Sequence, residues 1–296
     1  MARTLRLGRR GRRFKSCLPD QNRSAHSQTV KFYSKLIKFR GGKIHFLDNK
    51  AQSSNLYIVF PPGATDARFI YQIRSIFTKS NARIISISYP SRFKSSRIEG
   101  FDSIDSISEY LYKFLKKLLY SHSNYSINIM AFSFGTAVVT RLLQNHSELF
   151  KPDTPVRIVL VNGGEFFGEK ASEIFKRLFE PALNNSKYLK ILRLIITTVF
   201  KFLPRRLYPN HRLLDLNEQW LSTIGYRINL KYSIEYPVVV IRGTRDIVIT
   251  PESKDKLLKI YPNSTVVYYP GDHIYDYKVL DRYPIALEYL KNWIDK

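Results

Sequence analysis

The sequence is poor in the residues and patterns that mark several classes of protein. It has one cysteine, Cys17, in 296 residues, which excludes a disulfide framework and a metal site built from several thiolates, and fits a reducing compartment such as the cytoplasm. It has no run of eighteen apolar residues, so no membrane-spanning helix is predicted. The HExxH, CxxC and GxxxxGKS/T motifs are also missing, and we expect neither a metal ion nor a cofactor.

Acidic residues are scarce at the start of the chain. The first fifteen residues contain seven Lys or Arg and no Asp or Glu, and the whole chain carries a net charge of +24. Taking these seven charges away leaves about +17, so the rest of the chain is basic as well. Such a charge attracts anionic partners, which include nucleic acid, an anionic membrane surface and an acyl carrier with its phosphates. The sequence contains no specific nucleic-acid motif.

Residues 1–30 show no apolar periodicity, and we predict that they form a basic arm that is disordered in isolation. They have no apolar segment of the kind that a secretory signal needs. An Arg-rich start without acids also fits an organellar transit peptide, which stays as the second interpretation, and nucleic-acid binding is the third. The preferred interpretation is a cytoplasmic protein that carries a solvated arm, with or without contact to a membrane surface.

The apolar residues, 44% of the chain, recur with periods that predict alternating strands and helices. Two alternating runs within residues 35–47 flank Gly41-Gly42 and predict a β-hairpin. Further strands are predicted at residues 55–60, 82–89, 127–131, 155–162, 237–243 and 264–269, and helices at 66–78, 103–119, 135–143, 251–260 and 283–294. We therefore expect an α/β fold whose mostly parallel sheet of about eight strands is covered by helices on both faces.

The alternation stops at residues 165–235, which are helix-like and too long for one crossover. We predict that they form a helical cap inserted between two parts of the core, residues 31–164 and 236–296. Within the cap, residues 184–212 contain seven Lys or Arg and no acid, and predict a basic amphipathic helix that ends at Pro204. The preferred interpretation is a lid that buries its apolar face on the core. The alternatives are contact with an anionic membrane and the lining of an acyl-chain pocket, and both point to an apolar, lipid-like acyl substrate.

Ser133 lies at the join between a predicted strand and a predicted helix. A serine on such a turn is held in a strained, positive-φ conformation that exposes its Oγ. Strand and helix pass close together there, so only small residues fit two positions to either side, and Ala131 and Gly135 meet this demand. The N–H groups at the helix start would stabilise negative charge beside Ser133. Because a serine before a helix is more often a simple N-cap, its assignment as a nucleophile depends on the other groups of the site.

A nucleophilic serine needs a base, and the base needs a third group that holds it in place. Of the six histidines, only His273 directly follows a predicted parallel strand, at the edge of the sheet where strand C-termini gather. The others lie in the arm, the cap, an early strand or beside helix ends. Asp246 and Glu165 each follow a predicted strand at the same edge, and either could be the third group. As an alternative role, Asp246 could serve only an Asx-turn.

Residues 131–135, Ala-Phe-Ser-Phe-Gly, resemble the nucleophile elbow of the α/β-hydrolase superfamily, with Ala131 where that family more often has glycine. The resemblance covers about residues 35–294 and implies acyl-transfer chemistry, usually hydrolysis. It implies that Ser133 attacks a carbonyl carbon and that His273 takes the proton and passes it to the leaving group. In this fold the carboxylate stands between serine and histidine in the chain, and this order favours Asp246 over Glu165.

The same resemblance requires an oxyanion hole of two backbone N–H donors. Phe134, which follows the nucleophile, offers one of them. The other should come from the loop after residue 60, where Pro61 and Pro62 have no N–H to donate. That leaves Gly63 or Ala64, and the family often has His-Gly at this place.

We therefore expect a serine hydrolase that cleaves an ester or thioester through an acyl-enzyme. One alternative is a catalytically inactive protein of this fold that binds an anionic partner through its arm and cap. Another is an acyltransferase of the same fold, which passes the acyl group to an acceptor other than water. The sequence gives no indication of an oligomeric state.

Overall fold

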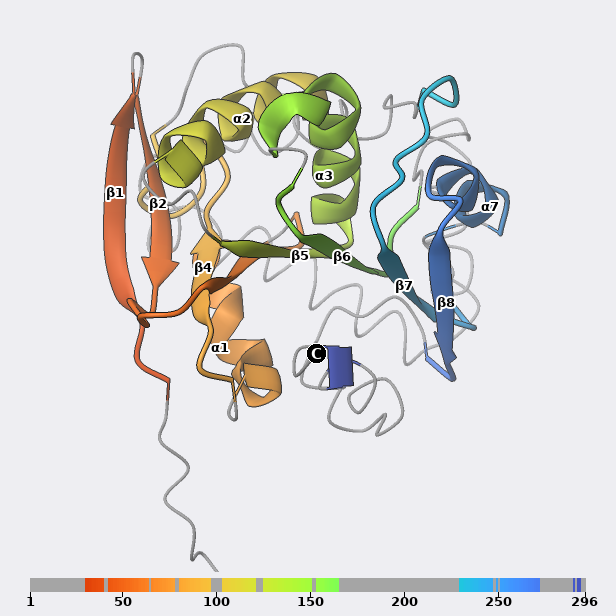
Figure 1. The fold of residues 1–296 in the computed structure, drawn as a ribbon, viewed down its shortest axis with the longest axis horizontal. Helices are drawn as coiled ribbons and strands as arrows, with labels where there is room; N and C mark the ends of the chain where they lie inside the picture. Colours follow the sequence, from red (N-terminus) through yellow and green to blue (C-terminus); the bar gives the residue numbers. More distant parts are fainter. Residues whose placement is uncertain are drawn as a thin grey trace, which may run out of the picture.

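A computed structural model of the chain describes residues 30–39, 42–63, 65–77, 80–96, 103–120, 125–150, 153–164, 229–246, 249, 251–271, 290 and 292–293. These residues build an eight-stranded sheet with the order β1-β2-β4-β3-β5-β6-β7-β8 (Figure 1). The strands are β1 (Tyr33–Phe39), β2 (Gly42–Asp48), β3 (Asn55–Phe60), β4 (Arg83–Ile87), β5 (Ser126–Phe132), β6 (Val156–Val161), β7 (Val238–Gly243) and β8 (Ser264–Tyr269).

The direction of the strands places their C-terminal ends together. β1 pairs antiparallel with β2, and β2 pairs antiparallel with β4. From β4 to β8 all neighbours pair in parallel. The loops that follow β3, β4, β5, β6, β7 and β8 therefore leave the sheet at one edge, which is where open α/β sheets bind their ligands.

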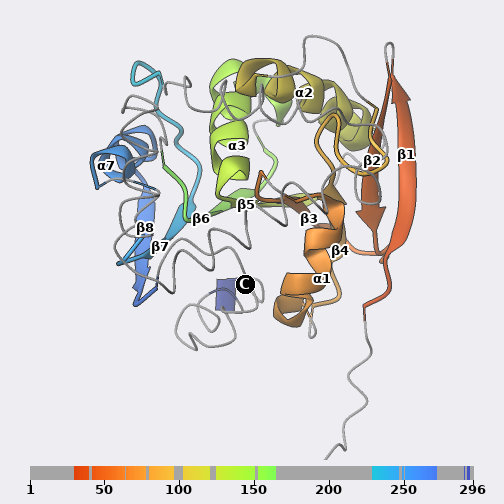
Figure 2. The ribbon, with the colours of Figure 1, turned by 180° about the vertical axis from the view of Figure 1, so that it is seen from behind.

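Helices lie on both faces of the sheet (Figures 1 and 2). α2 (Ile104–Tyr120), α3 (Phe134–Asn145) and α7 (Pro251–Ile260) pack on one face, whereas α1 (Ile70–Ile73) and the helical residue Trp293 pack on the other. Each strand contributes to both cores by alternation. In β3, Ile58 and Phe60 belong to the first core and Tyr57 and Val59 to the second, which explains why its sequence is almost continuously apolar.

Most of the predicted elements agree with the structure to within one or two residues. The hairpin, the six further strands and the helices at 103–119, 135–143 and 251–260 are all present. The predicted helix at 66–78 differs, because it is divided into a 3₁₀ turn (Ala67–Phe69), the single turn of α1, and a second 3₁₀ turn (Arg74–Phe77). Its β-branched and aromatic side chains have weak helix propensity and are buried for packing instead.

Three predicted regions are not settled by the described residues. The arm at residues 1–29 and the greater part of the cap, residues 165–228, lie outside them, as do most residues of the predicted last helix. Residues 229–235 run as turns and irregular chain, and Ile234 donates its N–H to the carbonyl of Ile260 at the end of α7, 2.7 Å away. Among the described helices none is long and apolar enough to cross a bilayer.

Candidate active site

Ser133 is the turn between β5 and α3, and its backbone has φ 49° and ψ −115°. Such a conformation is costly for a residue with a Cβ and persists only where surrounding bonds enforce it. The Ser133 N–H donates to the carbonyl of Val161 at 2.9 Å, and the Ser133 carbonyl accepts from the N–H (2.9 Å) and the hydroxyl (2.7 Å) of Thr136. The strained turn predicted from the sequence is therefore confirmed, and the bonds that hold it are identified.

Gly135 shows why this turn demands small residues. A Cβ at this position would lie 2.6 Å from the carbonyl oxygen of Phe60 and 3.0 Å from that of Pro61. α3 therefore passes directly over the end of β3. Ala131 is fully buried in β5 between β3 and β6.

The loop that follows β3 lies against the residue after Ser133. A Cβ on Gly63 would lie 3.0 Å from the Cβ of Phe134. The Phe134 ring packs edge-on to Tyr89, with 5.2 Å between the ring centres, and the Tyr89 hydroxyl donates to the Pro61 carbonyl at 2.7 Å. The structure thus brings together Gly63 and Phe134, two of the predicted oxyanion-hole residues, whereas Ala64 lies outside the described residues.

A buried histidine is linked by hydrogen bonds to the chain just after the loop that follows β3. The sequence analysis did not assign this histidine a role. His45 in β2 is fully buried, and its Nδ1 lies 2.9 Å from the hydroxyl of Ser88, the residue after β4. The Ser88 oxygen also accepts the N–H of Ala67, 3.0 Å away, at the start of the 3₁₀ turn that follows the loop. Ser88 can then donate its proton to Nδ1, which leaves the other ring N–H, on Nε2, to bind the Ser34 hydroxyl at 3.0 Å.

The electrostatics of His45 agree with this neutral tautomer. The pKa of His45 is lowered from 6.5 to about 4, and burial is the main cause. The nearby carboxylate of Asp66 raises this pKa, whereas the charges of Lys94 and Arg68 lower it. The sequence gives only a weak signal for the contact between His45 and Ser88, because it shows them only as polar residues in two predicted strands that are otherwise mostly apolar. Their meeting depends on strand register, which the sequence pattern does not give.

Asp246 follows β7 and is 9% exposed. Its Oδ1 accepts the N–H of Ile249, three residues further on, at 3.1 Å. An Asx-turn, the alternative role for this residue, would use the N–H two residues on. The loop also contacts the chain after β6, because a Cβ on Gly164 would lie 2.4 Å from Cγ2 of Ile249. Lys254 of α7 lies nearby. Burial lowers the pKa of its ammonium, and the Asp246 carboxylate opposes that change.

The loop of Asp246 is hydrogen-bonded to the chain that leads to His273. The N–H of Thr244 donates to the Tyr269 carbonyl and the N–H of Arg245 to the Gly271 carbonyl, both at 2.9 Å. The Arg245 guanidinium also reaches the Pro270 carbonyl at 3.2 Å. His273 comes two residues after Gly271 and lies outside the described residues, as does Glu165.

Asn162 joins the ends of three strands and was also missed by sequence reasoning. Its Nδ2 donates to the Tyr269 hydroxyl of β8 at 2.6 Å, and its Oδ1 accepts the N–H of Gly243 of β7 at 3.0 Å. It has φ 49°, a conformation that asparagine tolerates better than most residues.

Among the described residues, no three His, Cys, Asp or Glu side chains gather as metal ligands would.

Solved structures with a similar arrangement of strands and helices identify the fold. An α/β-hydrolase fold protein from Chitinophaga pinensis is similar with a TM-score of 0.64 and 16% identity, over 90% of this chain and 99% of that one. An esterase from Exiguobacterium antarcticum gives 0.60 and 14%, over 89% and 100%. A thermophilic esterase gives 0.57 and 21%, over 90% and 98%. The chain therefore has the α/β-hydrolase fold, as its elbow indicated.

The sequence itself identifies the family. A model of the serine hydrolase family FSH1 matches residues 39–275, a range that includes Ser133, Asp246 and His273. The chain belongs to this family and is an α/β-fold serine hydrolase. A search of curated proteins found no significant match.

Proposed function

We propose that the protein cleaves an ester or thioester through an acyl-enzyme formed on Ser133. The observation that carries this proposal is the strained turn of Ser133 at the C-terminal end of β5, with the first turn of α3 beside it and Gly63 against Phe134. The strained backbone conformation of this serine costs free energy, and it places Oγ where Oγ can reach a substrate carbonyl beside the oxyanion hole.

In the proposed reaction, His273 accepts the proton of the Ser133 hydroxyl as Oγ bonds to the carbonyl carbon. The carbonyl oxygen becomes an oxyanion, and the collapse of this intermediate expels the alcohol or thiol, which takes the proton from His273. Water then attacks the acyl-enzyme and gives a proton to His273, which returns it to Ser133 Oγ as the acid leaves. Asp246 orients the imidazole and stabilises its cation, a role supported by the bonds from Thr244 and Arg245 to the chain before His273.

The oxyanion is proposed to accept two hydrogen bonds from backbone N–H groups. One donor is Phe134, and the other is Gly63 or Ala64. The contact between Gly63 and Phe134 supports this pair, because both donors must converge on one oxygen. The N-terminus of α3 adds the positive end of the helix dipole.

An apolar acyl substrate is the finer part of the proposal. It rests on the sequence of residues 184–212, whose apolar face could line a chain-binding pocket and whose basic face suits an anionic headgroup or carrier. Two similar solved structures are esterases, which agrees with an ester as the scissile group.

Labelling with a fluorophosphonate probe tests the nucleophile. We expect the wild type to be labelled and Ser133→Ala not to be, while Ser147→Ala, which removes an exposed serine, keeps full labelling. p-Nitrophenyl esters of graded length and one acyl thioester then give the acyl preference. A folded wild type that is neither labelled nor active would contradict the proposal, and products acylated on an added alcohol or amine would indicate a transferase.

A further inference from the structure

The positive charge of this protein is concentrated in the first third of the sequence. Residues 1–98 contain 21 Lys or Arg and three Asp or Glu, whereas residues 99–296 contain 27 and 21. The first part thus carries +18 of the net +24, and the second part carries +6. The described portion of the first part is the β1 side of the sheet, with β2, β3, β4 and α1.

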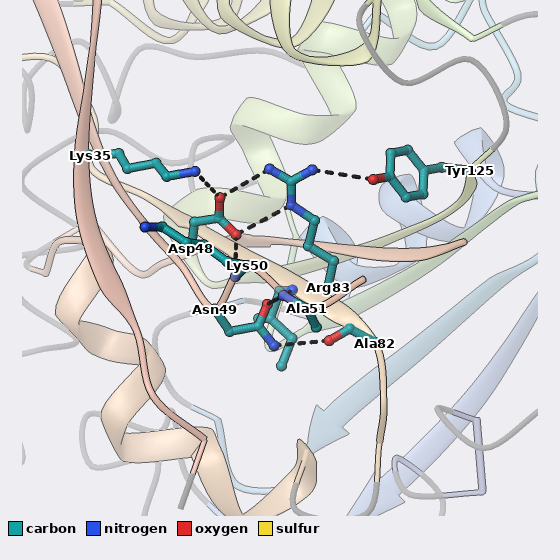
Figure 3. A network of polar contacts seen from close by, with 9 residues as sticks. Lys35, Asp48, Asn49, Lys50, Ala51, Ala82, Arg83 and Tyr125 are labelled. Carbon is teal, nitrogen blue, oxygen red and sulfur yellow. Dashed lines mark hydrogen bonds and ion pairs between the residues drawn. The ribbon is translucent and has the colours of Figure 1, made fainter. Parts of the chain in front are cut away.

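The carboxylates of residues 21–98 do not reach the surface of the fold. Between residues 21 and 98 the sequence has only Asp48 and Asp66, and their exposed fractions are 0% and 3%. Asp48 is held by Lys35 at 2.5 Å and by Arg83 at 3.0 Å (Figure 3). Burial alone would raise the pKa of Asp48, but the bonds from Arg83 and Lys35 outweigh it and lower the pKa below its usual value.

Asp66 is bound in the same manner, by Arg68 at 2.6 Å. Both carboxylates of this region are therefore neutralised inside the fold. Among the described residues 30–96, five cationic side chains remain exposed and no carboxylate does; the five are Lys31, Lys38, Lys50, Arg74 and Lys94. The field at this surface is consequently of one sign.

Four of these lysines lie in or against the outermost strand, and apolar side chains are exposed among them. Tyr33 is 38% exposed and Leu36 is 45% exposed. Lys50 and Lys31 lie 4.2 Å and 5.4 Å from the centre of the Tyr33 ring, and Lys94 lies 3.5 Å from the Ser34 hydroxyl. Side chains alternate between the two faces of a strand, so Tyr33, with Lys31 and Lys50, borders the sheet edge from one face, and Leu36, Lys38 and Lys94 border it from the other. We call this group at the edge of the sheet, Lys31, Tyr33, Leu36, Lys38, Lys50 and Lys94, the β1 surface.

We propose that the β1 surface docks on an anionic lipid bilayer. Lysines bind the headgroups of such a membrane electrostatically, while tyrosine and leucine enter its interfacial layer. A nucleic acid would use the lysines and stack on the tyrosine, but it offers little to an exposed leucine. Leu36, exposed on the same face of β1 as Lys38, therefore favours the bilayer. The Arg-rich residues 1–15 precede β1 in the chain and add charge of the same sign.

Co-sedimentation of the full-length protein with vesicles tests the proposal. We expect binding to phosphatidylcholine vesicles that contain about 30% phosphatidylserine, weak binding to phosphatidylcholine alone, and loss of binding in high salt. The double variant Lys38→Gln/Lys50→Gln should bind about 25-fold more weakly, since each lysine near such a surface contributes about fivefold. Leu36→Asn should also weaken binding, by a similar factor at every salt concentration at which the wild type still binds, because this contribution is apolar.

Lys231→Gln/Lys259→Gln is the matched control, because it removes two exposed lysines outside the β1 surface. It should keep nearly wild-type binding, and so should Ser133→Ala, which separates docking from catalysis. Absence of binding to the anionic vesicles, or equal losses in the two double variants, would overturn the proposal. A fluorescent single-stranded oligonucleotide tests the other ligand. If the wild type bound it tightly, the Lys38→Gln/Lys50→Gln variant did not, and vesicles were not bound, the β1 surface would serve nucleic acid and the proposal would be overturned.

Discussion

Asn162 and Tyr269 are joined by a hydrogen bond of 2.6 Å from Nδ2 of the asparagine to the phenol oxygen, where β6 and β8 end. The same side chain accepts the N–H of Gly243 at the end of β7. The carbonyl that holds the Ser133 N–H belongs to Val161, the residue before Asn162. Two adjacent residues therefore hold both loops: Val161 binds the turn of the proposed nucleophile through its backbone carbonyl, and Asn162 binds the start of the loop of the proposed acid through its side-chain amide.

Asn162→Gly should lower both stability and turnover. Glycine accepts the positive φ, so the change removes the side-chain bonds without adding strain. The buried Gly243 N–H loses its acceptor, and we expect the free energy of unfolding to fall by about 1–3 kcal/mol. Urea unfolding and steady-state kinetics would measure this, with kcat falling more than KM rises. Tyr269→Phe, which removes one of the two bonds, should have a smaller effect, and an unchanged kcat in Asn162→Gly would contradict the coupling.

Asp246→Asn should reduce kcat by about four orders of magnitude. The amide keeps an Oδ1 to accept the Ile249 N–H, so the turn and the stability should persist, whereas the imidazolium loses its counter-charge. Steady-state ester hydrolysis measures the effect, and Asp255→Asn on the exposed side of α7 is the control that keeps activity. If Asp246→Asn were fully active and Glu165→Gln inactive, the role of the acid would pass to Glu165.

Gly135→Ala should disrupt the elbow. The new methyl group would meet two carbonyl oxygens of the β3 end at 2.6 Å and 3.0 Å, and backbone cannot withdraw as a flexible side chain does. We expect a loss of about 1–3 kcal/mol in the free energy of unfolding together with loss of probe labelling. Ala131→Gly, which gives the residue more common in the superfamily, should retain labelling. An unaffected melting temperature in Gly135→Ala would show that α3 is not packed as described.

The elements that could be predicted from the sequence are those whose signal is local. β3 reads as an unbroken apolar strand because it is buried on both faces, and Ser133 could be found because the turn restricts its neighbours in the sequence to small residues. Its interpretation as a nucleophile also needed His273 and Asp246, because a serine before a helix is more often a simple N-cap. Asp246 could be nominated because it follows a recognisable strand.

The supporting residues could not be predicted, because they act through pairing between distant segments. Asn162 reads as the polar end of a strand, and its contact with Tyr269 spans 107 positions of the chain. His45 and Ser88 meet only because β2 and β4 pair antiparallel in one register. The prediction of one continuous helix at residues 66–78 was wrong for a related reason. Tertiary burial of the aromatic and β-branched residues there overrides the helical periodicity of the sequence.

His45 makes the stability of the fold depend on pH in a defined window. Its pKa is about 4 in the folded protein and 6.5 when solvated, so between these values the unfolded chain binds a proton that the folded chain does not. Stability from this source is complete above pH 6.5 and is lost as the pH falls toward 4, by about 3 kcal/mol in total. Asp48, with its lowered pKa, loses its contribution only below pH 3.8.

His45→Gln removes this titration while keeping a polar side chain. In urea unfolding at a series of pH values, we expect the wild type to lose stability between pH 6.5 and 4 and the variant to show a flatter profile there. The two should lose stability alike below pH 3.8, where the carboxylates titrate. Equal slopes in the upper window would mean that His45 is protonated in the folded protein, and the Ser88 hydroxyl would then have to accept from its ring rather than donate to it.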